Sequence, residues 1–409
     1  MEFSSNVSRL SPSATIAVST LARTLRAEGR DIVNLSAGEP DFPTPEWIAD
    51  AAVQAIRDGE TRYTPAPGIP ELRAAVAEDA ARDAVPGWAP EASQVVVTSG
   101  AKQALFNAIF ALFGPGDEVL VATPYWTSYP QMVGLAGADA VPVQGPAERD
   151  FRLDAGTLEA ARTRRTRGLI LCSPSNPTGS VYDAGEIEAV TRWAKEHGIV
   201  VISDEIYRHI SFVTEPGTRA PGLMGVDPVH VGPHVVVDGV SKAYAMTGWR
   251  IGWAIASGEV AGKLSALQSH TTSNAATPSQ HAALAALRER SRADAAIREM
   301  VVAFRRRRDL VVEGFRTRLP HLELVEPQGA FYLFVRIDSE FGGEVTGSQA
   351  WCSAVLEETG VAMVPGAAFG DDRWARLSYA TSDDRLEEAV RRLAEGRTRT
   401  GPATPGGAR

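Results

Sequence analysis

The feature that most constrains the fold of this chain is an alternation of short apolar runs with longer stretches rich in Ala, Leu and Glu. The runs are rich in β-branched residues and apolar at consecutive positions, which predicts strands buried on both faces. Helical stretches such as 101–113 and 184–196 separate several of these runs. This order predicts an α/β fold in which helices cover a mostly parallel sheet. The predicted strands are 94–98, 118–122, 168–172, 199–203 and 234–238.

The C-terminal part follows a different pattern. From 279 to 318 the sequence is helical and rich in arginine, and beyond it 329–337 and 376–379 predict strands of a smaller domain. The basic run 305–308 is interpreted as a solvated helix face, because acidic residues surround it. The last stretch, 398–409, is rich in Gly, Pro and Thr and predicts a disordered tail.

Composition narrows the class of protein. The 409 residues are 44% apolar and 22% charged, as in an ordinary globular protein with more than one domain. The formal net charge of −9 argues against nucleic acid as the main partner. Cys172 and Cys352 are too few for a disulfide framework, and no cysteine or histidine spacing indicates a metal site. No signal peptide or run of about 18 apolar residues is found, so a cytoplasmic location is predicted.

The most informative segment is 239–252, GVSKAYAMTGWRIG, which follows an apolar strand and contains Lys242 and Arg250. A buried lysine loses its charge readily and becomes a nucleophilic amine. The planar fork of arginine suits a phosphate group. The pair therefore indicates a Schiff base beside a phosphate site, although an exposed loop lysine would give the same pattern.

Two other predicted strands also end in polar motifs. In SDEIY, Asp204 lies at the carboxyl end of a strand, where open α/β sheets bind ligands. Asp204 could pair there with a protonated ring nitrogen and Tyr207 could donate to a ring oxygen, or Asp204 could simply cap a helix. In SPSNPTG, Asn176 can donate a hydrogen bond toward the same edge, although the motif is also typical of a tight turn.

The order Asn176, Asp204, Tyr207, Lys242, Arg250 resembles that of the class I, fold-type I pyridoxal-phosphate aminotransferases, and above all their bacterial aspartate aminotransferase branch. The resemblance covers nearly the whole chain. The segments that carry it are SPSATIAV, LSAGEPDF, YTPAPGIPELR, SGAKQALFN, PYWTSYP, SPSNPTG, SDEIY, SKAYAMTGWRIG, QSHTTSN, GAFY and RLSYATS.

The resemblance implies a large domain with a mostly parallel sheet of seven strands, covered by helices, and a smaller α+β domain. Residues 1–45 would form an N-terminal segment that joins the small domain, and 46–290 would form the large domain that binds the cofactor. Residues 291–396 would form a connecting helix and the small domain, followed by a disordered tail at 397–409. An additional DNA-binding domain, which a cofactor-bearing regulator would need, has no room in this division.

The resemblance also implies how pyridoxal 5'-phosphate is held. Lys242 would carry the cofactor covalently and move the substrate proton, and Asp204 would keep the ring nitrogen protonated. Tyr207 and Asn176 would hydrogen-bond the phenolic oxygen, and Trp126 would stack on the ring. The residues implied to surround the phosphate are Gly100, Ala101, Lys102, Ser241 and Arg250, with Gly239 at a position where other class I enzymes have serine.

For the assembly, the resemblance implies that Tyr63 reaches the phosphate of the other subunit, which makes a homodimer with active sites at the interface. For the substrate, it implies that Arg376 clamps the α-carboxylate, with Asn176 and the backbone of Gly38 alongside. Trp126 would border the substrate as well as the ring.

Lys102 would bind a distal carboxylate, helped by Ser13, Thr15 and segment 270–274 of the other subunit. These roles predict a ping-pong transaminase that moves the amino group of an acidic amino acid, with L-aspartate favoured, to 2-oxoglutarate. The alternatives are a broad-specificity or prephenate-directed aminotransferase and a specialised pyridoxal-phosphate enzyme, such as a lyase, of secondary metabolism.

Overall fold

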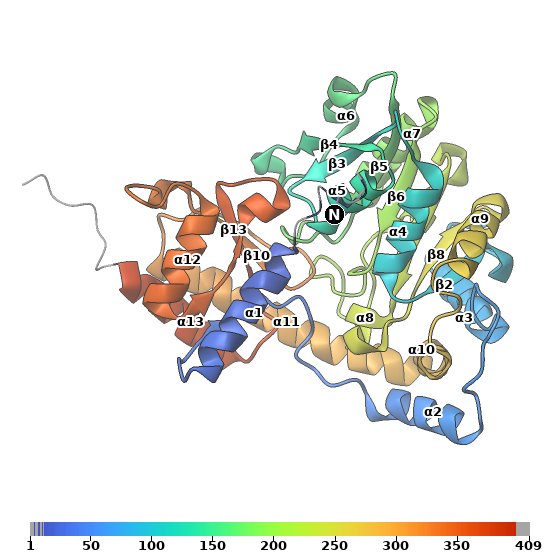
Figure 1. Cartoon of the computed structure of the whole chain (residues 1–409), viewed down its shortest axis with the longest axis horizontal. Coiled ribbons are helices and arrows are strands. Elements are labelled where there is room, and N and C mark those ends of the chain that lie inside the picture. Colours follow the sequence, from blue (N-terminus) through green and yellow to red (C-terminus); the bar gives the residue numbers. More distant parts are fainter. Residues whose placement is uncertain (1–3, 5–6, 9, 11, 398–409) are drawn as a thin grey trace, which may run out of the picture.

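The computed structural model describes residues 4, 7–8, 10 and 12–397, and its largest element is a seven-stranded sheet (Figure 1). Strand β8 runs antiparallel to both of its neighbours, and the remaining strand pairs are parallel. The predicted α/β class is therefore confirmed. In spatial order the strands are β2 (Val95–Thr98), β8 (Gly252–Ala256), β7 (His234–Gly239), β6 (Val200–Asp204), β5 (Thr166–Cys172), β3 (Glu118–Thr123) and β4 (Asp139–Gln144).

The five predicted strands lie within two residues of observed ones, whereas β4 and β8 were not predicted. Strand β4 is an edge strand, only partly buried, and it contains Pro142. Such a strand lacks the continuous apolar run that marks a central strand. Strand β8 is fully buried, but Ile255 is its only β-branched residue.

Helices surround this sheet (Figure 1). Helix α7 begins where the predicted helical stretch does, because Asp183 and Glu186 form a reciprocal capping box at its first turn. The helices are α2 (Glu46–Arg57), α3 (Pro70–Ala80), α4 (Ala101–Leu112), α5 (Ser128–Leu135), α6 (Ala155–Ala161), α7 (Ala184–Glu196), α8 (Val240–Ala243), α9 (Gly258–Ser269) and α10 (Thr277–Arg288).

A second, antiparallel sheet contains the two strands predicted near the C-terminus. Its order is β12 (Val364–Pro365), β13 (Trp374–Ser378), β10 (Tyr332–Arg336) and β9 (Leu324–Val325), and α12 (Ser348–Thr359) packs against it. Strand β1 (Val33–Asn34) pairs in parallel with β11 (Val361–Ala362), and α1 (Ala14–Ala27) contacts β11 and β12. The N-terminal residues thus join the C-terminal elements, while the domain boundaries themselves stay a prediction.

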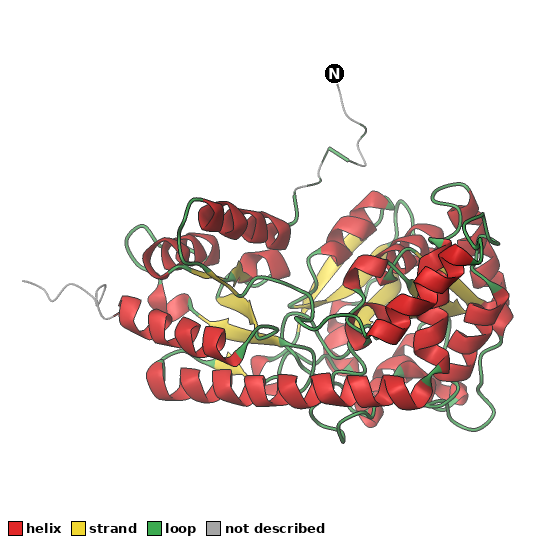
Figure 2. Cartoon of the chain, turned by 90° about the horizontal axis from the view of Figure 1, so that it is seen from below, coloured by secondary structure: helices red, strands yellow, loops and turns green. Residues whose placement is uncertain are grey.

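The helical stretch predicted at 279–318 is two helices, α10 and α11 (Arg290–Arg318), because the backbone leaves the helical region at Glu289. Helix α11 is the long helix at the lower edge of Figure 2, and it extends beneath both sheets. Its basic run is a solvated face only in part, which corrects the interpretation of 305–308: Arg306 is exposed, whereas Arg307 is buried. Arg307 is only 8% exposed and bonds Asp41 at 2.8 and 2.9 Å and Asp383 at 3.2 Å.

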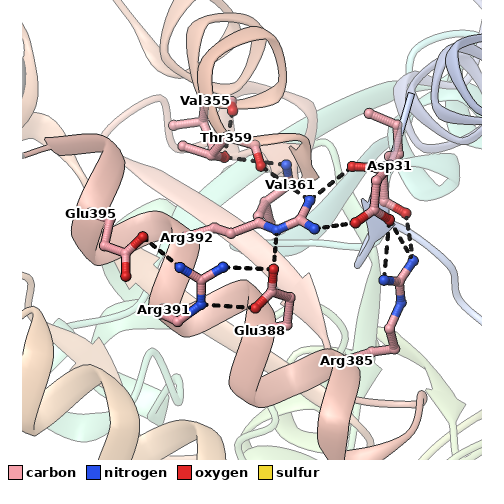
Figure 3. A network of polar contacts seen from close by, with 10 residues as sticks. Asp31, Val355, Thr359, Val361, Arg385, Glu388, Arg391, Arg392 and Glu395 are labelled. Atoms are coloured by element: carbon pink, nitrogen blue, oxygen red, sulfur yellow. Dashed lines mark hydrogen bonds and ion pairs between the residues drawn. The ribbon is translucent and has the colours of Figure 1, made fainter. Parts of the chain in front are cut away.

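Helix α13 (Asp383–Arg397) is held to the N-terminal region by an ionic network (Figure 3). Arg392 donates to the backbone oxygen of Asp31 at 2.8 Å and also pairs with its carboxylate, to which Arg385 donates at 3.2 Å. These two arginines lower the pKa of the exposed Asp31 carboxyl. The tail predicted after α13 lies outside the described residues. Within the described part of the chain, no helix combines the length and apolar character needed to cross a membrane.

Candidate active site

A cavity of about 400 Å³ opens at the carboxyl ends of β5, β6 and β7, bordered by α1 and by residues of β10 and β13. Two of the predicted site residues do not line it. Gly100 lies directly behind it as the N-cap of α4, and Tyr63 is 91% exposed on the surface. The predicted residues that do line it are Ser13, Thr15, Gly38, Ala101, Lys102, Trp126, Asn176, Asp204, Tyr207, Ser241, Lys242, Arg250 and Arg376.

Lys242 lies in α8, which starts immediately after β7 and directs the lysine into the cavity. Its Nζ donates to the carbonyl oxygen of Gly38 at 2.5 Å and lies 5.7 Å from the centre of the Tyr207 ring. Burial lowers the pKa of Lys242 to about 8, and the positive charges of Arg250 and Arg376 act in the same direction. A useful fraction of this amine is therefore neutral near neutral pH, as a nucleophile or base requires.

Asp204 is the last residue of β6 and is only 3% exposed. It caps no helix, since the residues after it form turns, so the capping alternative is wrong. One carboxylate oxygen accepts from the Tyr129 hydroxyl at 2.6 Å, and the other accepts from the backbone N–H of Ile206 at 3.3 Å. Burial raises the pKa of Asp204 to about 6, and both hydrogen bonds oppose that rise.

Arg376 lies on β13 and is 1% exposed. The central carbon of its guanidinium, Cζ, is 4.3 Å from the centre of the Tyr332 ring. Its Nη1 donates to the side-chain oxygen of Asn176 at 2.9 Å, and its Nη2 donates to the backbone oxygen of Ser36 at 2.9 Å. Its Nε is buried without a hydrogen-bond partner. A buried arginine held in one orientation with a donor left over is suited to bind a carboxylate.

Tyr207 lines the same cavity, and its hydroxyl is 2.8 Å from that of Tyr332. Burial raises the pKa of Tyr207 well above its usual value, so the phenol stays protonated and can donate. The side-chain oxygen of Asn176 accepts a hydrogen bond from Arg376, so the amide nitrogen of Asn176 is the atom that can donate. Both side chains can therefore donate to an oxygen atom in the cavity, as the sequence predicts.

The start of α4 forms a cradle for an anion. Gly100 has a φ of +85°, and a Cβ there would lie 2.5 Å from Nη2 of Arg250, so the position requires glycine. No side chain caps the helix, and Arg250 is the nearest charge. Open N–H groups at a helix start, together with a guanidinium, are suited to a phosphate. Because Asp204 and Lys242 line the same cavity, the described residues fit pyridoxal phosphate.

Lys102 lies in the first turn of α4, at the exposed edge of the cavity. Its Nζ lies 4.8 Å from the centre of the Trp126 ring. Desolvation by its surroundings, and next the charge of Arg250, lower the pKa of Lys102. The side chain therefore lies beside Trp126 at the edge of the cavity, where a second anionic group of a ligand would meet it.

Several lining residues were missed by the sequence analysis. Tyr129 lies within the quoted PYWTSYP segment, but nothing in the sequence links it to Asp204. Ser19 and Arg23 continue the line of Thr15 along α1 at four-residue spacing, a signal that would have found them. Segment 270–274, by contrast, does not line this cavity, and its role toward another subunit stays a prediction.

Comparison with known proteins decides the family. The family model for class I and II aminotransferases matches residues 30–393. The chain belongs to the class I and II aminotransferase family. This aminotransferase is 43% identical over 396 residues to an aspartate aminotransferase from Streptomyces avermitilis. The match covers 95% of each chain. It is 44% identical over 401 residues to an aspartate/prephenate aminotransferase from Cereibacter sphaeroides, in a match that covers 95% of this chain and 97% of the relative.

Solved structures agree with the sequence comparisons. An aspartate aminotransferase from Thermus thermophilus, solved with maleate, matches this aminotransferase with a TM-score of 0.90 and 41% identity, over 97% of this chain and 100% of that one. An aspartate aminotransferase from Thermotoga maritima matches with a TM-score of 0.86 and 39% identity, over 97% and 100% of the two chains. The aminotransferase is therefore an enzyme of the aspartate aminotransferase type.

Proposed function

We propose that this enzyme uses pyridoxal 5'-phosphate to transfer the amino group of L-aspartate to 2-oxoglutarate by a ping-pong mechanism. The observation that carries the proposal is that one cavity combines a lysine of lowered pKa, a buried carboxylate and a fixed arginine, with a second cation at its edge. The names of the similar proteins support the same substrate, and the Thermus enzyme was solved with a dicarboxylate.

The cofactor would be held at three points by residues of this chain. The backbone at the start of α4, with Ser241 and Arg250, would bind the phosphate, and Asp204 would accept from the protonated ring nitrogen. Tyr207 and Asn176 would donate to the phenolic oxygen while Trp126 covers one face of the ring. When bound, pyridoxal phosphate supplies an aldehyde that captures the amino group and a ring that withdraws electrons from the substrate Cα.

Lys242 would carry the proton during the reaction. Its Nζ is held by the Gly38 carbonyl at 2.5 Å, on the side of the cavity that faces Tyr207. A neutral amine in that place can take a proton from the substrate Cα and return it elsewhere on the reacting system. Its pKa of about 8 suits both directions of transfer near neutral pH.

Two cations would select the substrate. Arg376 would bind the α-carboxylate, because its guanidinium is fixed by Asn176 and Ser36 and its Nε still lacks a partner. Lys102 would bind the distal carboxylate, helped by the hydroxyls of Ser13 and Thr15, which line the same cavity. Amino acids with two carboxylates would engage both cations, whereas apolar amino acids would engage only Arg376.

We also propose that the enzyme is a homodimer. Tyr63 is 91% exposed although it is large and aromatic, and it does not line the active-site cavity of its own chain. A tyrosine presented in this way would complete the phosphate site of a second copy, where segment 270–274 would also contribute. Sedimentation of the purified enzyme at micromolar concentration should give the mass of two chains.

A panel of amino donors with 2-oxoglutarate as acceptor tests the proposed substrate. We expect aspartate to give the highest kcat/KM, with oxaloacetate and glutamate as products. Alanine, leucine and phenylalanine should react at least tenfold less efficiently, since they leave Lys102 without a partner. An apolar donor that outperforms aspartate would contradict the assignment.

A prephenate-directed activity is the second candidate, because relatives from Cereibacter sphaeroides and Thermus thermophilus carry that name at 44% and 43% identity. Prephenate, like 2-oxoglutarate, has a carboxylate beside its keto group and a second one farther away. The same pair of cations could therefore accept it. Glutamate as donor with prephenate as acceptor measures this activity directly, and the ratio of the two kcat/KM values assigns the preferred acceptor.

A further inference from the structure

The carboxylate of Asp204 has one side-chain hydrogen-bond donor among the described residues, the hydroxyl of Tyr129 on α5. The distance is 2.6 Å, and both residues are almost fully buried, at 2% and 3% exposure. The backbone N–H of Ile206 is the other donor, at 3.3 Å. An ionised carboxylate has about four acceptor sites, so two remain for a group inside the cavity.

We propose that Tyr129 is a positioning residue that keeps the Asp204 carboxylate ionised and aimed into the cavity, and thereby sets the affinity for the ring nitrogen of the cofactor. The inference rests on the proposed function, in which Asp204 faces that nitrogen. Tyr129 itself touches neither the substrate nor the reacting atoms in this scheme. It acts through Asp204.

Among the charged and titratable groups around Asp204, Tyr129 does most to stabilise the ionised carboxylate. Cys172 on β5 approaches from the neighbouring strand, but burial raises its pKa to about 12, so the thiol is neutral. Glu205, the next residue, raises the pKa of Asp204 by repulsion, and Lys242 lowers it by less than either hydrogen bond does. The hydrogen bond from Tyr129 opposes the effect of burial more than any other contact does.

The hydroxyl of Tyr129 acts toward Asp204 as a hydrogen-bond donor. Burial, and next the negative charge of Asp204, raise the pKa of Tyr129 well above its usual value. The hydroxyl therefore keeps its proton wherever the enzyme is folded and does not compete for the proton of the ring nitrogen. A hydrogen bond to a buried charge is among the stronger ones in proteins.

Tyr129 also connects two parts of the proposed cofactor site. Its ring packs edge-on against Trp126 with 5.4 Å between the ring centres. Trp126, which would cover the ring face, lies two residues before α5 begins, and Tyr129, which would orient Asp204, lies in the first turn of that helix. Tyr129→Phe keeps this ring packing and removes only the hydroxyl, so it isolates the hydrogen bond.

The test measures cofactor binding and not turnover. Full-length enzyme, dialysed free of cofactor, is titrated with pyridoxal phosphate between pH 5 and pH 9, and the dissociation constant is read from absorbance. Without its donor the ionised form of Asp204 is less stable, so its pKa rises. We expect Tyr129→Phe to weaken binding about tenfold near pH 7.5 and to move the acid-side loss of affinity to higher pH.

Two controls separate this role from a structural one. Tyr379→Phe removes another buried hydroxyl, which donates to the Ala330 carbonyl at 3.3 Å, and should leave the dissociation constant within twofold of wild type. In the Asp204→Asn background, adding Tyr129→Phe should change affinity by less than about twofold, because the carboxylate it serves is gone.

The outcomes are distinct. Unchanged affinity and pH profile in Tyr129→Phe would overturn the inference and leave the proposed function intact. An equal loss in the wild-type and Asp204→Asn backgrounds would also overturn it, since the tyrosine would then act through packing. Wild-type enzyme that binds no pyridoxal phosphate would overturn the proposed function and, with it, this inference.

Discussion

The floor and the rim of the cavity are built in opposite ways. The floor, here Asn176, Asp204 and Arg376, consists of polar side chains that are at most 5% exposed and fixed by hydrogen bonds. The rim, here Arg23, Lys102 and Arg250, consists of exposed cations on helices and loops. Burial shifts protonation and fixes geometry, whereas exposed charges act through longer-range attraction and are weakened by salt.

This difference predicts which changes affect every substrate and which affect only some. The floor and Lys242 would contact groups common to all amino acids and to the cofactor. Of the rim cations, Arg250 would bind the cofactor phosphate, whereas Lys102 and Arg23 would meet the parts of a substrate that differ from one amino acid to another. The largest losses should therefore be shared by all donors, and the smallest effects should depend on the donor and on salt.

The largest effect is expected for Lys242→Ala. Loss of the amine removes both the covalent attachment and the proton carrier, so turnover should fall by about 10³-fold or more for every donor. Borohydride reduction of wild-type enzyme with its cofactor, followed by peptide mapping, should place the label on Lys242. Lys102→Gln serves as the control and should keep the label. A label on any other lysine would refute the assignment.

Arg376→Lys should lower kcat/KM strongly and by the same factor for every amino donor. The lysine keeps the charge but loses the planar fork held by Asn176 and Ser36. We expect kcat/KM to fall about 100-fold for aspartate and for alanine alike. Steady-state kinetics with both donors measure this directly. A loss confined to aspartate would mean that Arg376 binds the distal carboxylate instead.

Lys102→Gln should separate the two donors. It keeps most of the side-chain length and removes the charge beside Trp126. A charge-assisted contact partly shielded from water is worth roughly 1.5–3 kcal/mol, or about 10- to 150-fold in kcat/KM for aspartate. Alanine has no distal carboxylate and should be spared. Equal losses for both donors would mean that Lys102 serves the cofactor phosphate, which its place in the first turn of α4 would allow.

The pKa of Lys242 predicts a pH dependence for cofactor capture. Because burial lowers that pKa to about 8, the neutral amine becomes about tenfold more abundant between pH 6 and pH 7 and levels off above pH 8. The rate at which cofactor-free enzyme captures pyridoxal phosphate, followed by stopped-flow absorbance, should show this profile. An ordinary lysine, with a pKa of about 10.4, would give a rate that still rises beyond pH 9.

The contrast between floor and rim also explains what the sequence could reveal. Asn176, Asp204 and Lys242 follow continuous apolar runs, so the strands that end at them predict their shared edge. Tyr129 was not predicted as a site residue because it contacts Asp204 from α5, and contacts between separate elements leave no local sequence pattern. Of the strands in the seven-stranded sheet, β4 and β8 were missed for lack of a β-branched run.

The C-terminal region was the least predictable from local pattern. Arg307 belongs to a run of four arginines that looks solvent-exposed, yet it is buried between Asp41 and Asp383. Those two carboxylates lie more than 70 residues away along the chain on either side. No local rule for charge patterns includes such distant partners, so the burial of a single arginine in a basic run follows only from the tertiary structure.

The smallest effect concerns Arg23, which lies on the cavity side of α1 two turns beyond Thr15. Val18 and Ala22 of α1 pack against Ile32 and the α12–β11 region, whereas Arg23 lines the cavity. An exposed cation at that place should attract doubly charged substrates over a Debye length of about 10 Å at 0.1 M salt.

Arg23→Gln should therefore raise KM for aspartate and 2-oxoglutarate about twofold at low ionic strength, with kcat unchanged. The effect should vanish near 1 M salt, where screening reaches about 3 Å. Arg164→Gln removes the same charge from an exposed turn before β5 and should change neither constant. A fall in kcat, or a loss that persists in high salt, would place Arg23 in direct contact with the bound substrate, and the rim would then extend farther along α1 than steering requires.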